Sequence, residues 1–209
     1  MFSQFKGSTF ENSYFFIFDP NLERSPTDLS FQCKVAGPWL LNFKSWLEQM
    51  TDVRDLNKEM YFSRFPPSLN SLTRYLIDGP IENPNQILFM IVDQVGTLHG
   101  HIGLKLDRHG NVNVDNVLRI SGNSPGAMRM ALQKILTWGN ETLGISEYSL
   151  QVISTNERAI AFYKELGFFL HQRISLRIEH FLDETTNLVP STVENSNTRD
   201  EMLIMRIAL

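Results

Sequence analysis

The chain has 209 residues, of which 42% are hydrophobic, and its formal net charge at pH 7 is -4. This composition supports a packed core and excludes a chain that is disordered throughout. The charge leaves no electrostatic footprint for nucleic acid or an anionic membrane, so neither is expected as a partner. No stretch resembles a signal peptide or approaches the roughly 18 apolar residues of a membrane span. The single cysteine, Cys33, excludes an internal disulfide and indicates a reducing, cytoplasmic setting.

The first half of the chain predicts one strand followed by helices. Residues 13–20 form a short apolar run that Asp-Pro closes, which is typical of a strand. Residues 25–39 fit no single pattern. Helical or partly helical segments are expected over residues 39–50, 52–62 and 68–80. Ser68 or Asn70 is expected to cap the last of these helices.

The second half of the chain predicts mainly strands. They are expected over residues 86–96, 98–107, 111–118, 147–153, 168–181 and 201–209. A long helix is expected over residues 124–144, with Ser124 as its N-cap and Gly144 at its end. A second helix is expected within residues 154–169. Residues 183–200 are polar and predict a long loop.

This order of elements predicts one domain over residues 1–209, with an α/β fold. The unit from residue 111 to residue 153 runs strand, helix, strand, and the helix supplies the crossover that parallel strands require. The strands over residues 86–96, 98–107 and 111–118 form a meander. A mixed sheet with helices on both faces is therefore expected.

The stretch "NERAIAFYKELGF" resembles the late signature of the GNAT N-acetyltransferases, in which an asparagine opens a helix that ends on Gly-Phe. The matching positions are Asn156, Ala159, Phe162, Tyr163, Gly167 and Phe168. The resemblance implies the GNAT fold, with a mixed, mostly antiparallel central sheet flanked by helices on both faces. It also implies acetyl-CoA as the acetyl donor.

A second stretch, "VLRISGNSPGAM", resembles the glycine-rich turn that binds the pyrophosphate in this family. Gly122, Ser124 and Gly126 fall where three alternating glycines usually lie, and Ser121 falls where the family usually has Arg or Gln. Glycines allow the backbone to approach a ligand closely, and a helix N-terminus attracts an anion. An ordinary helix cap explains the same residues. The implied cofactor contacts are Ser121, Gly122, Asn123, Ser124, Gly126, Ala127 and Met128.

The resemblance implies roles for residues of the late signature. Tyr163 lies near the thioester sulfur in the family and can protonate the departing thiolate, since a phenol of pKa ~10 holds its proton at neutral pH. The alternative is an aromatic residue that only packs. Asn156 either caps the helix or also lies beside the pantetheine arm, as do Ala159 and Phe162. Phe168 is expected in the core.

The resemblance also implies a bulge in strand 111–118 whose amides, at Val117 and Leu118, bind the pantetheine arm and polarise the thioester carbonyl. Asp115 could receive the proton of the amine or be a solvated strand residue. His99 and His101 are two residues apart, so they are expected to share a strand face, as bases or as rim residues.

Other residues carry weaker signals. Cys33 is expected to be a small buried residue, and no metal-binding motif is present. Aromatic residues of the early helices are expected to form a wall of the acceptor site or to belong to the core: Trp39, Phe43, Trp46 and Tyr61.

The sequence therefore predicts transfer of acetyl from acetyl-CoA to a primary amine of a small molecule, by direct attack. A diffuse similarity indicates a nucleotide-linked amino sugar of surface polysaccharide biosynthesis as the acceptor. Alternatives are a protein N-terminus, a polyamine, an antibiotic, or a non-catalytic acyl-CoA-binding module. The oligomeric state is not predicted.

Overall fold

The computed structural model describes residues 1–13, 15–18, 31–64, 67–121, 126–181, 185–192 and 196–209. The strands are β1 Phe15–Phe18, β2 Phe31–Val35, β3 Ser63–Arg64, β4 Gln86–Asp93, β5 Leu98–Leu106, β6 Val112–Arg119, β7 Glu147–Ile153, β8 Phe169–His180, β9 Thr186–Pro190 and β10 Glu201–Ala208. The α-helices are α1 Lys44–Leu56, α2 Leu69–Leu76, α3 Ala127–Leu143 and α4 Glu157–Glu165. No helix of the described ranges is long and apolar enough to cross a bilayer.

The strands form a ten-stranded sheet in the order β1-β2-β4-β5-β6-β7-β10-β8-β9-β3. Every neighbouring pair is antiparallel except β6 and β7, which are parallel. Helix α3 connects these two strands, as the crossover rule requires. The expected mixed, mostly antiparallel sheet is confirmed.

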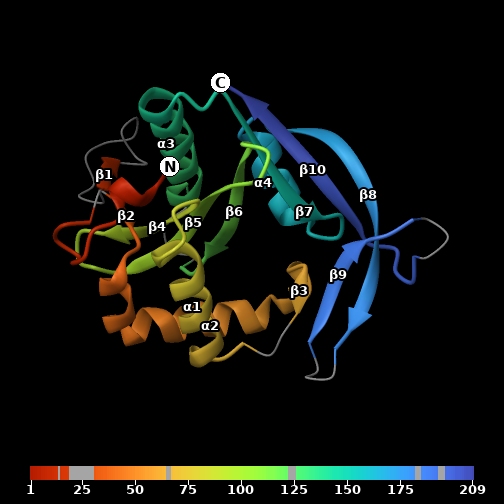
Figure 1. Ribbon diagram of the computed structural model, residues 1–209, viewed down its shortest axis with the longest axis horizontal. Coiled ribbons are helices and arrows are strands. Elements are labelled where there is room, and N and C mark those ends of the chain that lie inside the picture. Colours follow the sequence, from red (N-terminus) through yellow and green to blue (C-terminus); the bar gives the residue numbers. More distant parts are fainter. Residues whose placement is uncertain (14, 19–30, 65–66, 122–125, 182–184, 193–195) are drawn as a thin grey trace.

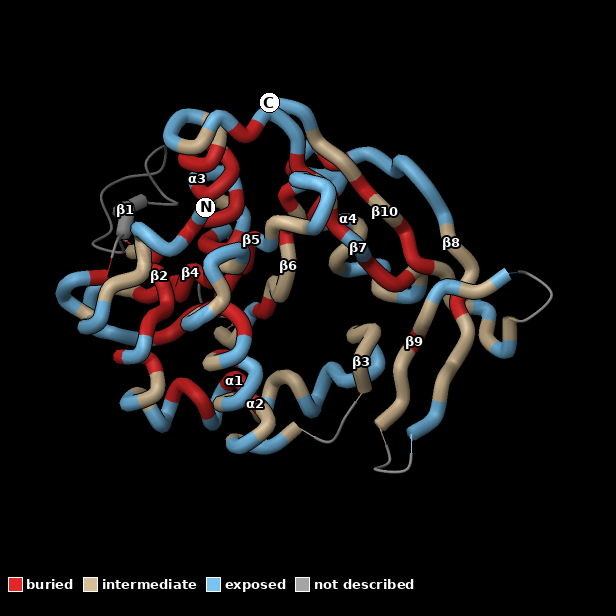
Figure 2. Tube along the Cα trace, viewed as in Figure 1, coloured by how far each residue is buried: buried red, intermediate tan, exposed pale blue. Residues whose placement is uncertain are grey.

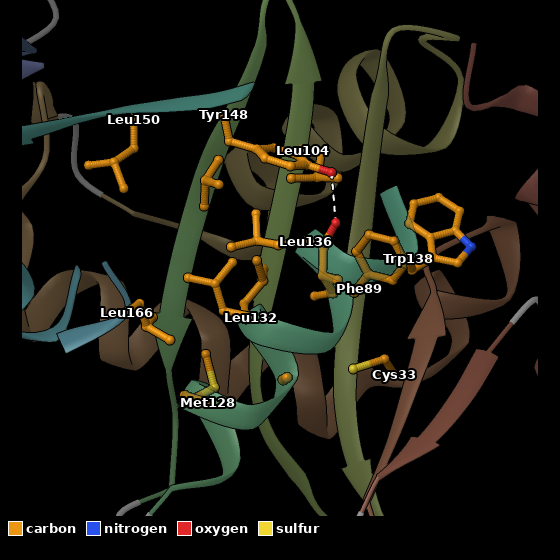
Figure 3. Close-up of a cluster of buried hydrophobic side chains, with 14 of the residues drawn as sticks. Cys33, Phe89, Leu104, Met128, Leu132, Leu136, Trp138, Tyr148, Leu150 and Leu166 are labelled. Atoms are coloured by element: carbon orange, nitrogen blue, oxygen red, sulfur yellow. Dashed lines mark hydrogen bonds between the residues drawn. The ribbon is translucent and has the colours of Figure 1, made fainter. Parts of the chain in front are cut away.

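Helices cover both faces of the sheet, as expected (Figure 1). On one face, α3 packs on the central strands through a fully or nearly fully buried set that includes Phe89, Leu132, Leu136 and Trp138. Figure 3 shows this cluster, where the Tyr148 hydroxyl donates to the backbone oxygen of Leu136 over 3.0 Å. On the other face, α1 and α2 bury residues such as Trp46, Met50, Leu72 and Leu76. Buried residues concentrate on the central strands and α3 (Figure 2).

The predicted helices of the first half are present with different bounds. The segment 39–50 divides into a 3-10 turn, Pro38–Asn42, and α1, which continues to Leu56. Ser68 is the N-cap of α2, where its side chain and that of Ser71 form a capping box. The segment 25–39, which fitted no pattern, contains β2.

The expected loop over residues 183–200 is partly wrong, because it contains β9. This strand pairs with β8 along five residues, and it also pairs with β3 at Ser63 and Arg64. Leu188 is 5% exposed and packs with Leu176 and Met202 in a small core. One buried leucine among polar residues gives too weak a periodic pattern to predict a strand.

The sheet opens where β6 and β7 meet. These strands pair at only three positions, from Val112–Tyr148 to Val114–Leu150, although both strands continue for several residues beyond. The pairing with β5 shifts register between Asp115 and Leu118, which is a β-bulge in β6. Asn116 in this bulge has a φ of 47°, the only positive φ of a non-glycine residue in the described part of the chain. The bulge expected in this strand is therefore present.

Candidate active site

A cavity of about 760 Å³ lies at the opening between β6 and β7. We call it the donor cavity. Its walls come from the β6 bulge, the start of α3, the end of β7, α4, and the segment after α1. Nine of the predicted site residues line it: Asp115, Val117, Leu118, Gly126, Met128, Asn156, Ala159, Phe162 and Tyr163. Two segments far apart in the sequence thus meet at one cavity.

Other predicted site residues do not line the donor cavity. The side chain of Ala127 is 1% exposed and belongs to the core. Only its backbone could contact a ligand at the start of α3. The backbone amide of Ser121 donates to the oxygen of His99 over 3.2 Å, which attaches this residue to β5. Gly122, Asn123 and Ser124 lie outside the described residues, and so does the predicted N-cap of the long helix. Gly126 precedes the helix with a φ of 89°.

The late signature has the local geometry that the sequence predicts. The side-chain oxygen of Asn156 accepts the amide of Ala159 over 3.2 Å, so Asn156 is the N-cap of α4. Gly167 has a φ of 93°, which favours glycine, and it ends the helix. Phe168 is 2% exposed and lies in the core. These features hold α4 in the position that places Tyr163 at the cavity.

Tyr163 is 8% exposed, and its ring contacts those of Phe162 and Phe168 at centroid distances of 5.4 and 5.9 Å. Burial, with a contribution from the charge of Asp115, raises the pKa of Tyr163 above its ordinary value. Its hydroxyl has no hydrogen-bond partner within the described ranges. A protonated phenol with a free hydroxyl therefore faces the cavity, and it can donate a proton or a hydrogen bond.

Asn116 organises a polar network at the bulge. Its backbone amide donates to Asp115 Oδ1 over 2.9 Å, and its Nδ2 donates to Asp115 Oδ2 over 3.1 Å and to the Tyr75 hydroxyl over 2.5 Å. His101 Nδ1 lies 2.7 Å from the backbone oxygen of Asn116, so this ring nitrogen is the one that carries hydrogen. The network fixes the Asp115 carboxylate and the bulge in one arrangement.

A second cavity, also of about 760 Å³, lies on the other side of the bulge, between β5, α1 and α2. We call it the acceptor cavity. Its lining includes Arg54, Tyr75 and His101. Three residues line both cavities: Tyr61, Asn116 and Leu118. The two cavities therefore meet at the bulge of β6, and molecules bound in them would meet there.

The prediction that His99 and His101 share a strand face is wrong. The pairing of β4 with β5 shifts register at Ile91–Gly100 and Val92–Leu98, which makes His99 the extra residue of a second bulge. His99 consequently lies on the α3 face, where its ring packs on Phe31 and its Nε2 is 2.8 Å from Asp93 Oδ2. His101 alone faces the acceptor cavity.

Burial lowers the pKa of His101 from 6.5 to about 4, with a contribution from the charge of Arg54. The unfolded chain therefore binds a proton that the folded chain excludes between pH 6.5 and 4, so acidification destabilises the fold. We expect the free energy of unfolding to fall by up to about 3 kcal/mol through this group as the pH drops across that window. Urea denaturation at pH 7.5 and 5.0 measures the loss.

The variant His101→Asn keeps a donor toward the Asn116 oxygen and removes the titrating group. Its loss of stability between the two pH values should be smaller than that of the wild type. An equal loss in both proteins would show that other groups carry the acid sensitivity.

The early aromatic residues divide between core and site. Trp39, Phe43 and Trp46 pack on one another with centroid distances of 4.5 to 6.2 Å, and none of them lines either cavity. Tyr61 lines both cavities, so it is the member that can contact an acceptor. Cys33 is fully buried, and burial raises the pKa of its thiol. In the described ranges, no group of three possible metal ligands lies close together.

Sequence reasoning missed the two side chains that α1 and α2 bring to the bulge, Arg54 and Tyr75. Each lies in a helix that was predicted from the spacing of its apolar residues. That spacing identifies the buried face of the helix and says nothing about which polar side chains reach a site. The role of Asn116 had a usable signal, because asparagine is several-fold enriched among non-glycine residues with positive φ.

Residues 50–168 match the sequence profile described as the Acetyltransferase (GNAT) family. A spermidine N-acetyltransferase from Vibrio cholerae, solved with CoA and spermine, is similar with a TM-score of 0.59 and 16% identity over 88% of this chain and 96% of that chain. The spermidine/spermine N-acetyltransferase SpeG from Vibrio cholerae, solved with manganese ions, gives a TM-score of 0.51 and 16% identity over 79% and 88% of the two chains. A comparison with curated proteins gives no significant match.

The profile covers more than half of the chain, and the chain belongs to the GNAT acetyltransferase family. As a member of this family it is an N-acetyltransferase, the class of enzyme that takes the acetyl group from acetyl-CoA. The structural similarity at 16% identity supports the GNAT fold.

Proposed function

We propose that the protein transfers acetyl directly from acetyl-CoA to a primary amine of a small molecule, with the reacting groups meeting at the β6 bulge. The observation that carries this proposal is the junction of the donor and acceptor cavities at Asn116 and Leu118. Acetyl-CoA supplies an activated acyl group as a thioester. The chain has to orient that group, stabilise the charge that forms on its carbonyl oxygen, and move two protons.

The backbone of β6 supplies the oxyanion donors in this proposal. The amide of Ile120 donates to the His99 oxygen on β5 over 2.9 Å. Amides alternate in direction along a regular strand, so the amide of Arg119 points away from β5, and Arg119 lines the donor cavity. Val117, within the bulge, lines the same cavity and is proposed as the other donor. The amide of Leu118 points toward β5, and Arg119 therefore replaces it in the donor pair expected from the sequence. Preorganised amides of this kind stabilise charge as it develops.

The pyrophosphate of acetyl-CoA is proposed to bind where α3 begins. Gly126 lines the donor cavity directly before the free amides of the first helical turn, which favour an anion. Arg129 and Arg158 line the same cavity and add positive charge. The pantetheine arm is proposed to lie along β6 beside Asn156, Ala159 and Phe162.

Two side chains are proposed to handle protons. Tyr163 donates its proton to the departing sulfur, since its raised pKa keeps the phenol protonated until the thiolate forms. Asp115 accepts the proton of the amine, directly or through water, because the network around Asn116 holds its carboxylate at the cavity junction. His101 is the alternative base, from the acceptor side.

The identity of the acceptor is the most specific part of the proposal. The sequence indicates a nucleotide-linked amino sugar, which the similar structures do not support, since they are named as spermidine acetyltransferases. The described lining of the acceptor cavity has two arginines, Arg54 and Arg74, against one carboxylate, Asp78. This excess of positive charge opposes a polycation. We propose an amine that is less basic than lysine, such as that of an amino sugar, with a polyamine as the alternative.

The proposal is tested by measuring thiol release from acetyl-CoA with a panel of amines that includes amino-sugar nucleotides and polyamines. Release that depends on the acceptor supports direct transfer. A strong preference for polyamines would defeat the weakly basic acceptor. If acetyl-CoA binds but no acceptor gives release, the non-catalytic binding module becomes the better account.

The base is tested by the pH dependence of Asp115→Asn. We expect this variant to lower turnover more at pH 6.5 than at pH 8.5, because more of the amine is already neutral at the higher pH. Steady-state rates of both proteins at each pH give the ratio of wild-type to variant turnover. If Asp115→Asn leaves the pH profile unchanged and His101→Asn alters it, His101 is the base.

A further inference from the structure

Two side chains of opposite charge lie on the two sides of the β6 bulge. Asp115 lines the donor cavity next to Tyr163, and Arg54, from the last turn of α1, lines the acceptor cavity. The two charges are linked through the junction: Arg54 Cζ lies 4.2 Å from the ring of Tyr61, which lines both cavities, and Asn116 donates to both Asp115 and Tyr75. A molecule at the junction therefore lies between a cation on the acceptor side and an anion on the donor side.

The guanidinium of Arg54 is held in a defined place. Its Cζ lies 4.2 Å from the centroid of the Tyr61 ring, and its Nη2 donates to the backbone oxygen of Ser63 over 3.4 Å. The charge of Arg54 also acts on His101 and Tyr75, which both line the acceptor cavity. Arg54 is thus close to the place where the proposed transfer occurs, and a guanidinium is a preferred partner of a carboxylate or phosphate.

A second arginine lies further out on the same wall. Arg74 is exposed at the cavity, on the helix that carries Tyr75. Asp78, one turn along the same chain segment, offsets one of the two positive charges. The net charge of the described lining is still positive, which favours an anionic group in this cavity.

We infer that the acceptor carries an acidic group, a carboxylate or a phosphate, in addition to the amine that receives the acetyl group. Arg54 binds the acid while Asp115 faces the amine, which makes the junction complementary to a molecule with both groups. This inference rests on the proposed acetyl transfer and deepens it. An amino-sugar nucleotide and an amino acid both belong to the class, whereas spermidine does not.

The test compares acceptors that differ only in the acid. Alanine against alaninamide probes a carboxylate, glucosamine 6-phosphate against glucosamine probes a phosphate, and spermidine represents the polycations. In the wild type, the acidic member of at least one pair should have a kcat/KM about 10–100-fold above that of its neutral partner, the range of a hydrogen bond to a charged group. The pair that shows the difference identifies the acid.

Variants connect the preference to the arginines. Arg54→Gln should remove most of the preference for the acidic acceptor. Arg54→Lys should keep part of that preference because the charge remains, and Arg74→Gln should reduce it less than Arg54→Gln does. The matched control is Arg173→Gln, on β8, where the arginine pairs with Glu201 and lines neither cavity. All four variants should bind acetyl-CoA as the wild type does.

Calorimetric binding of the same panel to the CoA-loaded protein separates this inference from the proposed transfer. If acidic members bind preferentially through Arg54 but release no thiol, the transfer to small amines fails and the acid site stands. If neutral members or spermidine bind and react equally well or better, the inference is wrong. It is also wrong if the preference persists in both Arg54→Gln and Arg74→Gln.

Discussion

Tyr163→Phe is expected to lower the rate of acetyl transfer by about 10²–10⁴-fold, the range of general acid catalysis. The affinity for acetyl-CoA should stay near that of the wild type, because the ring still packs between Phe162 and Phe168. Stability should also change little, since the hydroxyl has no hydrogen-bond partner within the described ranges. Single-turnover rates with a good acceptor, together with calorimetric titration of acetyl-CoA, measure the two quantities.

Tyr148→Phe is the matched control for this experiment. Tyr148 is also buried, but its hydroxyl donates to the Leu136 oxygen inside the core and lines neither cavity. Its removal should cost about 0.5–1.5 kcal/mol of stability and leave turnover unchanged. If Tyr163→Phe has full turnover, Tyr163 is only a packing residue and the sulfur receives its proton from another group.

Gly126→Val is expected to abolish binding of acetyl-CoA while the protein remains folded. Gly126 has a φ of 89°, which a β-branched residue adopts only with strain, and it lies at the cavity directly before α3. In the wild type, acetyl-CoA at about 100 times its Kd adds ~2.7 kcal/mol of stability, which for a domain of this size raises Tm by ~5–10 °C. The variant should show no such shift.

The control for Gly126→Val lies at the other end of the same helix. Gly144 has a φ of 68°, and a Cβ placed there would meet nothing within 4 Å. Gly144→Val therefore introduces similar backbone strain without touching the donor cavity. It should lose stability and keep the acetyl-CoA shift. If Gly126→Val keeps the full Tm shift with acetyl-CoA, the pyrophosphate does not bind at the start of α3.

The parts of the site that depend on short stretches of chain could be predicted from the sequence. The cap at Asn156, the left-handed Gly167 and the buried Phe168 are local consequences of residue type and spacing. The bulge and the place of Tyr163 came with the resemblance to the family. The cap, the glycine and the buried Phe168 need only neighbouring residues to be predicted correctly.

The parts that depend on register could not be predicted. His99 and His101 were expected on one face, but a single extra residue in β5 moves His99 to the other side. The same alternation is the reason why we propose Arg119 in place of Leu118 as the second amide donor. No pattern of residue types in β5 reveals that its pairing with β4 shifts at this position.

The parts of the site that depend on packing between distant elements could not be predicted either. Arg54 and Tyr75 look like ordinary residues of two helices, and only the packing of α1 and α2 against β5 brings them to the acceptor cavity. β9 was missed because its stability comes from Leu188 packing on β8 and β10 rather than from its own composition.

The pairing of β3 with β9 has a consequence for synthesis of the chain on the ribosome. Ser63 and Arg64 follow α1, yet their strand partners, Asn187 and Thr186, emerge only after β8 has been made. Thr185, at the start of the same late segment, lines the acceptor cavity. The donor cavity, by contrast, takes its lining from residues up to Glu165. Strand β7, which borders this cavity, pairs along its whole length with β10, and Phe62 of its lining accepts the amide of Leu188, so neither cavity reaches its final form before β9 and β10 have been translated.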